Sequence, residues 1–284
     1  MGTDVQKKTD EPAASMNKKT LILSGMGLNC ERETAYACEK SGAHSVEILH
    51  TLRFLQGQVK LKDFDFIVFI GGFLDGDYLG SARVGANRFK FGAPESVRLK
   101  EQFVEFIDQG KLILGICNGF QLLVKLGLLP DENLAFNSQL MSLTQNQRGI
   151  FEDRWVHLKI NPDNQNVFMR NLDQLYLPVR HGEGRIVVTD ENARQQLVNN
   201  HQIAAFYADE QGQVTDQYPY NPNGSWHNIA AVSNQKGTIL GMMPHPEAYN
   251  HYTNHPQWTR LTFNEEDGEG LKIFKNAYHY LNQL

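Results

Sequence analysis

The pentapeptide Gly115-Ile116-Cys117-Asn118-Gly119 offers the clearest chemistry in the sequence. A buried apolar run precedes it and a helical pattern follows, so Cys117 is expected on a sharp turn from strand to helix. The Gly-x-nucleophile-x-Gly form is typical of a nucleophile elbow, in which small neighbours permit that turn. The start of the following helix carries partial positive charge and therefore favours a thiolate. A buried structural cysteine at a tight turn is the alternative interpretation.

A second group of reactive side chains is His245-Pro246-Glu247. A thiolate that performs acyl transfer needs an imidazole to move protons, and the imidazole needs an acceptor to orient it. If this segment is extended, alternate side chains share one face, so His245 and Glu247 lie side by side. The apolar run from Ile239 to Met243 would bring them to the edge where Cys117 stands. The alternative is a surface loop, since ten histidines make any single one weak support.

The third feature is Gly71-Gly72-Phe73, at the end of another buried apolar run. Glycines at this point let the backbone approach a substrate and direct an amide into the site. The backbone amides of Gly72 and Asn118 are therefore candidates for an oxyanion hole. An ordinary turn after a strand is the alternative.

The elements that must position these residues alternate along the first half of the chain. Apolar runs and helical patterns at this spacing predict a parallel sheet covered by helices and joined by right-handed crossovers. The second half predicts mixed or antiparallel strands and a closing helix. The predicted fold class is α/β: an open, mostly parallel, flavodoxin-like sheet with additional mixed or antiparallel strands. The predicted strands cover residues 20–25, 46–49, 65–73, 112–117, 155–160, 186–189, 202–207, 229–233 and 238–243, and the helices cover 30–41, 96–109, 118–129 and 270–281.

Composition limits the function classes. The chain has 284 residues, of which 41% are hydrophobic, and a net charge of -5, so it lacks the basic character of nucleic-acid binders. Neither a membrane span nor a secretory signal is expected. We expect residues 1–19 to be a disordered lead-in, either natural or left from cloning, and residues 20–284 to form a single domain. Three cysteines suit a reduced, cytoplasmic protein, with Cys30 and Cys38 packed in the core.

Several stretches together resemble a known family, the class I (triad) glutamine amidotransferases, and within it the glutaminase components of phosphoribosylformylglycinamidine synthase. The resemblance extends from about Thr20 to about Glu247. The stretches that carry it are GMGLNCERETAYACEKSGA (25–43), FIGGFLDGDYLG (69–80), LGICNGFQLL (114–123), FEDRWV (151–156), RHGEGR (180–185), NPNGS (221–225) and GMMPHPE (241–247).

The resemblance implies a role for each candidate residue. Cys117 would attack the side-chain amide of glutamine and carry a γ-glutamyl thioester. His245 would act as base and then as acid, oriented by Glu247. The amides of Gly72 and Asn118 would stabilise the oxyanion.

The resemblance also implies partners. Glutamine is the substrate, and the released ammonia passes to a larger ATP-dependent synthetase subunit that converts formylglycinamide ribonucleotide to its amidine, with or without a small accessory subunit. The chain lacks a Gly-x-x-x-x-Gly-Lys-Ser/Thr loop. We therefore expect no cofactor in this chain, and ATP and Mg on the synthetase.

Two further positions are linked to glutamine by the resemblance. Gln121 matches a family position that helps to hold bound glutamine, although a glutamine on the helix surface is the alternative. The segment Phe151–Trp155 borders the glutamine pocket in one interpretation and begins a packed strand in the other.

Acidic and histidine residues in two other motifs invite a metal interpretation. His181 and Glu183 lack a third or fourth ligand nearby, and Asp75 and Asp77 fail in the same way. We expect no metal and interpret both segments as turns near the pocket or the partner interface.

Two rival functions remain open. One is the glutaminase subunit of another amidotransferase, or a γ-glutamyl hydrolase, against which the GGFLDGDY and RHGEGR segments argue. The other is a regulatory subunit that kept the fold and lost catalysis, which the joint presence of Cys117, His245 and Glu247 disfavours.

Overall fold

A single nine-stranded sheet runs through both halves of the chain. The computed structural model describes residues 17–130 and 140–284. The strand order is β2-β1-β3-β4-β11-β10-β9-β6-β7. The first five strands of this order pair in parallel, and every pair from β11 to β7 is antiparallel. The parallel part has the 2-1-3-4-5 order of flavodoxin-like sheets. The predicted fold class is therefore confirmed.

The sheet has two kinds of strand. The parallel strands are β1 (Lys19–Ser24), β2 (Ser45–His50), β3 (Phe66–Phe69), β4 (Leu112–Ile116) and β11 (Ile239–Met242). The antiparallel strands are β6 (Glu152–Ile160), β7 (Gln174–His181), β9 (Ile203–Ala208) and β10 (Ile229–Ser233). A separate ribbon pairs β5 (Met141–Thr144) with β8 (Arg185–Val188). Every residue of β3, β4 and β11 is buried, which explains their unbroken apolar sequences.

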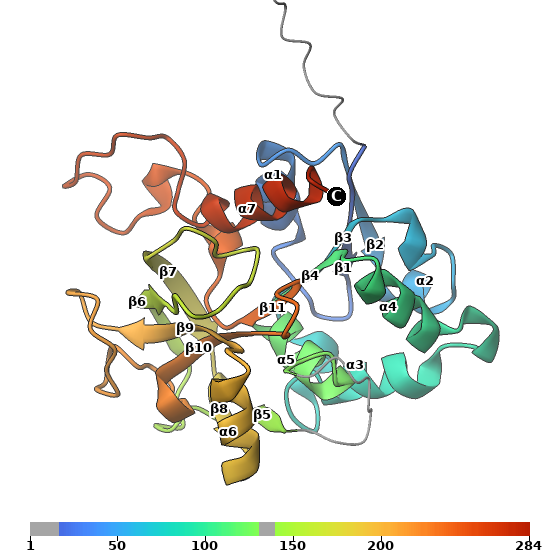
Figure 1. The fold of residues 1–284 in the computed structure, drawn as a ribbon, viewed down its shortest axis with the longest axis horizontal. Helices are drawn as coiled ribbons and strands as arrows, with labels where there is room; N and C mark the ends of the chain where they lie inside the picture. The colour runs from blue at the N-terminus through green and yellow to red at the C-terminus, as the bar shows by residue number, and fades with distance from the viewer. Residues whose placement is uncertain (1–16, 131–139) are drawn as a thin grey trace, which may run out of the picture.

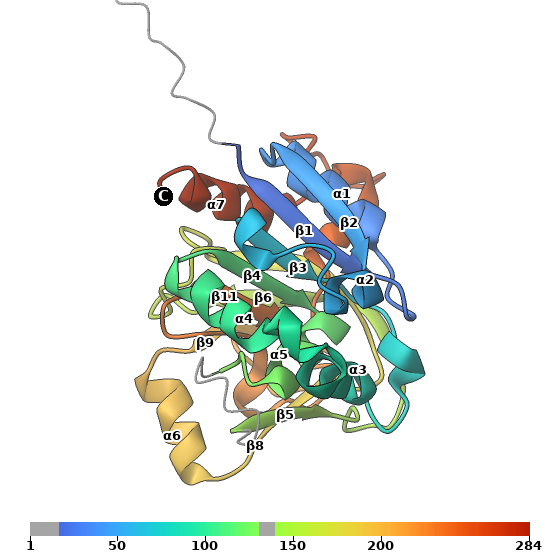
Figure 2. The ribbon, with the colours of Figure 1, turned by 90° about the vertical axis from the view of Figure 1, so that its right-hand side faces the viewer.

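Helices cover both faces of the parallel part. The described helices are α1 (Glu31–Lys40), α2 (Thr51–Leu55), α3 (Arg83–Asn87), α4 (Leu99–Asp108), α5 (Asn118–Leu126), α6 (Glu191–Asn199) and α7 (Leu271–Leu281), of which α6 lies beside β8 instead. Helices α1 and α7 lie together on one face, and α4 and α5 lie on the other (Figures 1 and 2). Among the described helices, none is long and apolar enough to cross a bilayer.

The largest omission of the sequence prediction is strand β7. Its sequence contains Pro178, and a proline argues against a central strand because it cannot donate to the ladder. In the structure β7 is the last strand of the sheet, so the proline costs no hydrogen bond on its open side. Strand β5 and helix α6 were also absent from the prediction, and α5 ends at Leu126 instead of Leu129.

The expected lead-in, residues 1–19, falls mostly outside the described residues. Its last residue, Lys19, already belongs to β1 and pairs with Ser45 of β2. The single domain over residues 20–284 stays a prediction.

Candidate active site

The candidate residues follow the carboxyl ends of parallel strands. Cys117 comes directly after β4, Gly72 follows β3, and His245 follows β11. The carboxyl ends of parallel strands lie at the same edge of the sheet. Open α/β sheets bind their ligands at this edge. The topology therefore brings three distant segments to one place.

The turn at Cys117 has the strained backbone of a nucleophile elbow. Cys117 has φ 52° and ψ -107° and stands directly before α5. A side chain on Gly119 would strike the carbonyl oxygen of Phe69 in β3, and one on Gly115 would come within 2.6 Å of Leu123 Cδ1. The two glycines thus let α5 pack closely against the sheet while the turn lifts the thiol above its edge. The backbone amide of Cys117 donates to Met242 O at 2.8 Å, which ties the turn to β11.

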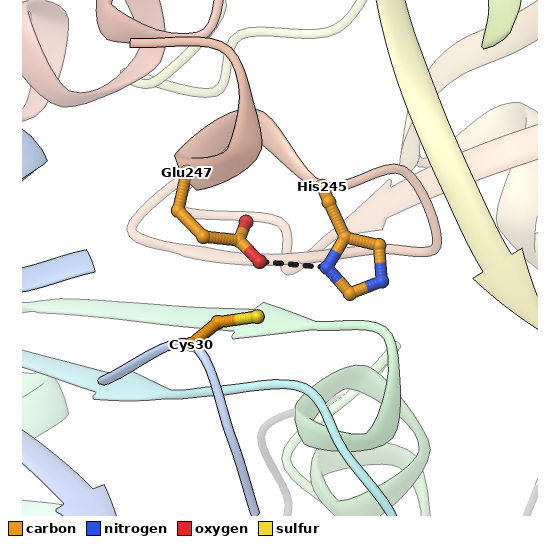
Figure 3. Close-up of side chains that lie close together, drawn as sticks. All are labelled: Cys30, His245 and Glu247. Atoms are coloured by element: carbon orange, nitrogen blue, oxygen red, sulfur yellow. Dashed lines mark hydrogen bonds and ion pairs between the residues drawn. The ribbon is translucent and has the colours of Figure 1, made fainter. Parts of the chain in front are cut away.

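His245 and Glu247 form a buried pair. His245 Nδ1 lies 2.6 Å from Glu247 Oε1, and both side chains are almost wholly buried (Figure 3). The segment is not extended throughout, as the sequence analysis assumed. Pro246 starts a short 3-10 turn (Pro246–Ala248), which carries Glu247 back beside the imidazole. The hydrogen bond at Nδ1 leaves Nε2 as the atom that faces away from Glu247.

The electrostatics of the pair favour a charged imidazole. Burial by itself lowers the pKa of His245, but the charge of Glu247 and the neighbouring Cys117 outweigh it and raise the pKa to about 10. His181 lies nearby and responds in the opposite direction: burial and the proximity of His245 lower its pKa to about 3. His181 is therefore neutral at physiological pH.

Gly71 lies beside both Cys117 and the imidazole of His245. A Cβ at Gly71 would lie 2.8 Å from His245 Cε1 and 3.5 Å from the Cβ of Cys117. The imidazole and the thiol-bearing residue therefore meet over this glycine. His245 Nε2 has no hydrogen-bond partner among the described residues, and the Cys117 thiol donates to Arg180 O at 3.6 Å. The thiol is close to the imidazole but is directed at a carbonyl of β7.

Two backbone amides lie open at this edge. Within residues 17–130 and 140–284, the N–H groups of Gly72 and Asn118 donate to no protein acceptor. Gly72 has φ +126°, and a Cβ there would come within 2.7 Å of Leu28 Cα, so only glycine fits. Both N–H groups are therefore free to donate to an oxyanion, as an oxyanion hole requires.

Gln121 is buried and fully engaged with the protein. Its Oε1 accepts from Asn118 Nδ2 at 2.9 Å, and its Nε2 donates to Glu183 O. The helix-surface alternative is therefore wrong. The contacts link α5 to the loop after β7, and a direct contact with glutamine stays a prediction.

The acidic loop after β3 is held by the same helix. Asn118 Nδ2 donates to Asp77 Oδ1 at 2.8 Å, and Leu74 N donates to Asn118 Oδ1 at 3.1 Å. Glu183 Oε2 accepts from Ser81 N at 3.1 Å. The carboxylates of Asp77 and Glu183 thus hold the loop of residues 74–82 in place. The expectation that these residues bind no metal stays a prediction.

The two ends of the segment Phe151–Trp155 lie in different environments. The rings of Phe151 and Phe73 stack at 6.4 Å, and both are about half exposed. Trp155 lies in β6 and packs on Tyr176 and Tyr249, with ring centres 5.2 and 5.1 Å away. The packed-strand interpretation therefore holds for Trp155.

Cys30 departs from the sequence prediction, whereas Cys38 is buried in the core as predicted. Cys30 lies in the turn after β1, is partly exposed, and directs its thiol towards the His245–Glu247 pair (Figure 3). Its sulfur, an imidazole nitrogen and a Glu247 oxygen all lie within 4.8 Å of one another. No spacing rule in the sequence connects Cys30 to Glu247, so sequence reasoning missed this contact.

A separate cleft of about 490 Å³ lies over β6 and β7, away from the parallel strand ends. Its lining includes His157, Tyr176, His255, Glu210 and Glu269. Its lining residues include no cysteine or serine.

Comparison with known proteins places the chain in a family. Residues 17–281 match the model of the CobB/CobQ-like glutamine amidotransferase domain. A relative from Dehalococcoides mccartyi, called phosphoribosylformylglycinamidine synthase subunit PurQ, is 40% identical over 94% of this chain and 98% of its own length. A protein of the same name from Archaeoglobus fulgidus is 36% identical over 94% and 98%.

Solved structures agree with these relatives. A chain in the structure of PurLQS from Thermotoga maritima matches with a TM-score of 0.67 and 27% identity, over 94% of this chain and all of that one. A glutamine amidotransferase from the same organism shares the fold, with a TM-score of 0.53 and 15% identity over 95% of this chain and all of its own. The chain therefore belongs to the CobB/CobQ-like glutamine amidotransferase family.

Proposed function

We propose that this chain is the glutaminase component of phosphoribosylformylglycinamidine synthase: it releases ammonia from the side-chain amide of glutamine and passes it to a synthetase subunit. The observation that carries the proposal is the Cys117 elbow, which meets the buried His245–Glu247 pair over Gly71. The relatives named for that synthase, at 36 to 40% identity over nearly the whole chain, support the choice of enzyme.

In this mechanism His245 takes the proton of the Cys117 thiol, Cys117 attacks the amide carbon of glutamine, and the carbonyl electrons move to oxygen. The amides of Gly72 and Asn118 donate to that oxyanion, and loss of one such donor costs about 10²- to 10³-fold in rate. Protonated His245 gives its proton to the leaving nitrogen, so the C–N bond breaks, ammonia departs and a γ-glutamyl thioester remains. His245 then takes a proton from water, which attacks the thioester and releases glutamate and the thiol. Glu247 orients the imidazole in both steps.

The resting contact of the thiol suggests how the partner controls the reaction. Cys117 donates to Arg180 O, and Nε2 of His245 has no partner within the described chain. Before attack the thiol has to turn from the carbonyl to the imidazole, and His245 has to be unprotonated at Nε2 to take the thiol proton. We therefore expect slow glutamine hydrolysis by the isolated chain and faster hydrolysis once the synthetase is bound.

Exposed apolar side chains beside the site suggest where the synthetase binds. Phe73 directly follows Gly72 and stacks on Phe151, and Tyr78 and Leu79 are more than half exposed on the same loop. Ammonia is mostly protonated in neutral water, so it has to leave directly into the partner. A synthetase that covers these side chains would also cover the exit from Cys117.

The synthetase partner would carry out the remaining chemistry, and the reaction would take place in the cytoplasm. ATP and Mg would bind to the synthetase, where formylglycinamide ribonucleotide is activated and then converted to its amidine by the ammonia. The reduced cysteines and the soluble substrates of this reaction suit the cytoplasm. Gln121 would help to hold glutamine by keeping the loop at Glu183 in place.

Labelling with a glutamine analogue that alkylates thiols, followed by mass mapping, tests the proposal. Selective modification of Cys117 is expected, because Cys38 is buried and burial, together with the nearby Glu247 charge, raises the pKa of Cys30 to about 12. A chain that has lost catalysis would show no selective label. Product analysis of the complex with ATP and formylglycinamide ribonucleotide separates this synthase from other amidotransferases.

A further inference from the structure

The two candidate oxyanion donors come from different segments of the chain, and one side chain joins them. Gly72 belongs to the loop after β3, and Asn118 starts α5. The side chain of Asn118 is buried, and its Oδ1 accepts from the backbone amide of Leu74, just beyond Gly72, at 3.1 Å. Asn118 thus offers one donor with its backbone, and with its side chain it holds the segment that carries the other.

The other end of the Asn118 side-chain amide faces two acceptors. Its Nδ2 donates to Asp77 Oδ1 at 2.8 Å and to Gln121 Oε1 at 2.9 Å. Gln121 is held in this orientation, because its Nε2 donates to the carbonyl oxygen of Glu183. The amide of Asn118 therefore uses both of its N–H groups and its oxygen in contacts within the protein.

Asp77 determines which way the amide of Asn118 faces. An ionised carboxylate accepts hydrogen bonds and donates none. If the amide were turned over, its oxygen would face the Asp77 carboxylate, and its N–H groups would face the N–H of Leu74. Both of these contacts would be repulsive. The negative charge of Asp77 therefore keeps Oδ1 of Asn118 on Leu74.

The loop that Asn118 holds has a strained backbone. Four of its residues other than glycine have positive φ, between 52° and 64°: Asp75, Asp77, Leu79 and Ala82. This conformation is costly for residues with a side chain, and it persists only where surrounding contacts fix it. The loop therefore depends on its contacts with Asn118 for its position.

A second set of contacts limits how far the loop can move. The backbone amide of Phe73 donates to Gly27 O at 2.9 Å, and that of Asn29 donates to Gly71 O at 3.0 Å. The turn after β1 thus holds the other side of Gly72. Loss of the Asn118 contact is therefore expected to displace the amide of Gly72 without unfolding the loop.

We propose that Asp77 is a positioning residue, which acts through the side chain of Asn118 to set the spacing between the two oxyanion donors. The inference rests on the proposed glutaminase function, because only a reaction that forms an oxyanion needs this spacing. Asp77 itself does not contact the reacting atoms.

A purely structural role of Asp77 is the alternative. Its Oδ1 also accepts from the backbone amide of Ala82 at 3.4 Å and so closes the turn of its own loop. That contact is longer than the 2.8 Å contact with Asn118. A purely structural role would lower the melting temperature of the chain, but it would not single out the step in which the oxyanion forms.

Substitutions of Asp77 in the complete complex with the synthetase test the proposal. Asp77→Ala removes the acceptor, so the Asn118 amide can turn and Gly72 can shift. We expect kcat for glutamine hydrolysis to fall about 10- to 100-fold, somewhat less than for the loss of a whole oxyanion donor. The KM for glutamine should stay within about threefold, because the oxyanion forms only in the transition state. Asp77→Asn keeps an acceptor oxygen and should retain kcat within about threefold.

Alkylation of Cys117 distinguishes the oxyanion hole from the nucleophile. Iodoacetamide reacts with a thiolate by direct displacement and forms no oxyanion. Its rate with Cys117 should therefore change by no more than about twofold in Asp77→Ala. A parallel fall in alkylation would show that the variant disturbs the thiol, and this overturns the proposal. An unchanged kcat in Asp77→Ala, or an equal loss in Asp77→Asn, overturns it as well.

A charge exchange provides a second test, which does not require Asp77→Ala to fold. Asn118→Asp keeps the backbone donor but sets two carboxylates against each other, so kcat should fall at least as far as in Asp77→Ala. Addition of Asp77→Asn places a donor opposite the new carboxylate and should raise kcat at least about fivefold. Absence of this recovery overturns the proposal, because two residues that act separately would give additive losses.

Ser81→Ala is the matched control. Ser81 lies in the same loop and is buried, and its hydroxyl has no hydrogen-bond partner among the described residues. Its removal should leave kcat unchanged, and a loss equal to that of Asp77→Ala would assign the effect to the loop as a whole and overturn the proposal. An inactive unmodified complex overturns the proposed function instead, whereas an active complex that is insensitive to the Asp77 substitutions overturns only the role of Asp77.

Discussion

Two turns of this molecule share one feature and differ in their chemistry. The turn from β1 to α1 and the turn from β4 to α5 each place a cysteine directly before a helix, at positive φ: 71° for Cys30 and 52° for Cys117. Both thiols lie next to the His245–Glu247 pair or its partner Gly71. Geometry alone therefore does not make a cysteine a nucleophile.

The difference lies in the surroundings of each sulfur. Burial is the main cause that raises the pKa of Cys30, and the charges of Glu247 and of Glu33 in the first turn of α1 add to it, so its thiolate is disfavoured. The first turn of α5 contains no acidic residue. A helix start lowers a thiol pKa only when acidic side chains do not cancel its partial charge. Burial and acidic neighbours thus keep Cys30 in its thiol form, whereas the first turn of α5 places no acidic residue beside Cys117.

The largest effect is expected from Cys117→Ala. Removal of the nucleophile should lower glutamine hydrolysis on the order of 10⁴- to 10⁶-fold, as for other catalytic nucleophiles. Ammonia release by the complex with the synthetase measures this loss. Ligation supplied with free ammonium should continue, because that step does not use Cys117. Loss of the ammonium-dependent reaction would show that the variant disturbs the complex and not only the chemistry.

Glu247→Gln should reduce kcat by about 10²- to 10⁴-fold, because the neutral amide no longer orients a charged imidazole. The pH dependence of stability gives a second measurement. The pKa of His245 rises from its ordinary value of 6.5 to about 10 in the fold. The resulting stability is full below pH 6.5 and is lost as the pH rises through about 10.

The melting temperature of the unmodified chain should therefore fall over that window relative to Glu247→Gln. The groups that face His245 here are Glu247, Cys117, Cys30 and His181. A difference between the two proteins that stays constant from pH 6.5 to 10 would contradict the assignment of the shift to Glu247.

Gly71→Ala should lower kcat about 10²-fold with little change in stability. The new methyl group would press on His245 Cε1, 2.8 Å away, and a displacement of about 1 Å in an active site has this cost. Steady-state kinetics of the complex measure the effect. Gly92→Ala is the control away from the site, because its φ is not positive and a Cβ there makes only an ordinary contact, 3.6 Å from Arg88 Cβ. Equal losses in both variants would point to a general disturbance of the fold instead of the imidazole.

The parts of the site that could be predicted from the sequence are those contained in short contiguous segments. The buried runs of β3 and β4, the small residues around Cys117 and the close spacing of His245 and Glu247 are all visible in short segments. The sequence could not predict Cys30 beneath Glu247, because that contact depends on how two distant strand ends meet at the sheet edge. Strand β7 was missed because Pro178 is acceptable only in an edge strand, and strand order is a property of the whole sheet.

The smallest effect is expected from Glu33→Gln, which changes the charge near Cys30 but not the reacting atoms. Glu33 is one of the charges that raise the pKa of Cys30, after burial and Glu247. Its side chain is exposed, so solvent screens it and alkylation of Cys30 at pH 9 to 10 should become only about two- to threefold faster. Mass mapping of Cys30 against Cys117 in the same sample measures the ratio. An acceleration of tenfold or more would mean that the acidic first turn, and not burial, keeps Cys30 protonated, and the contrast between the two turns would then be one of charge alone.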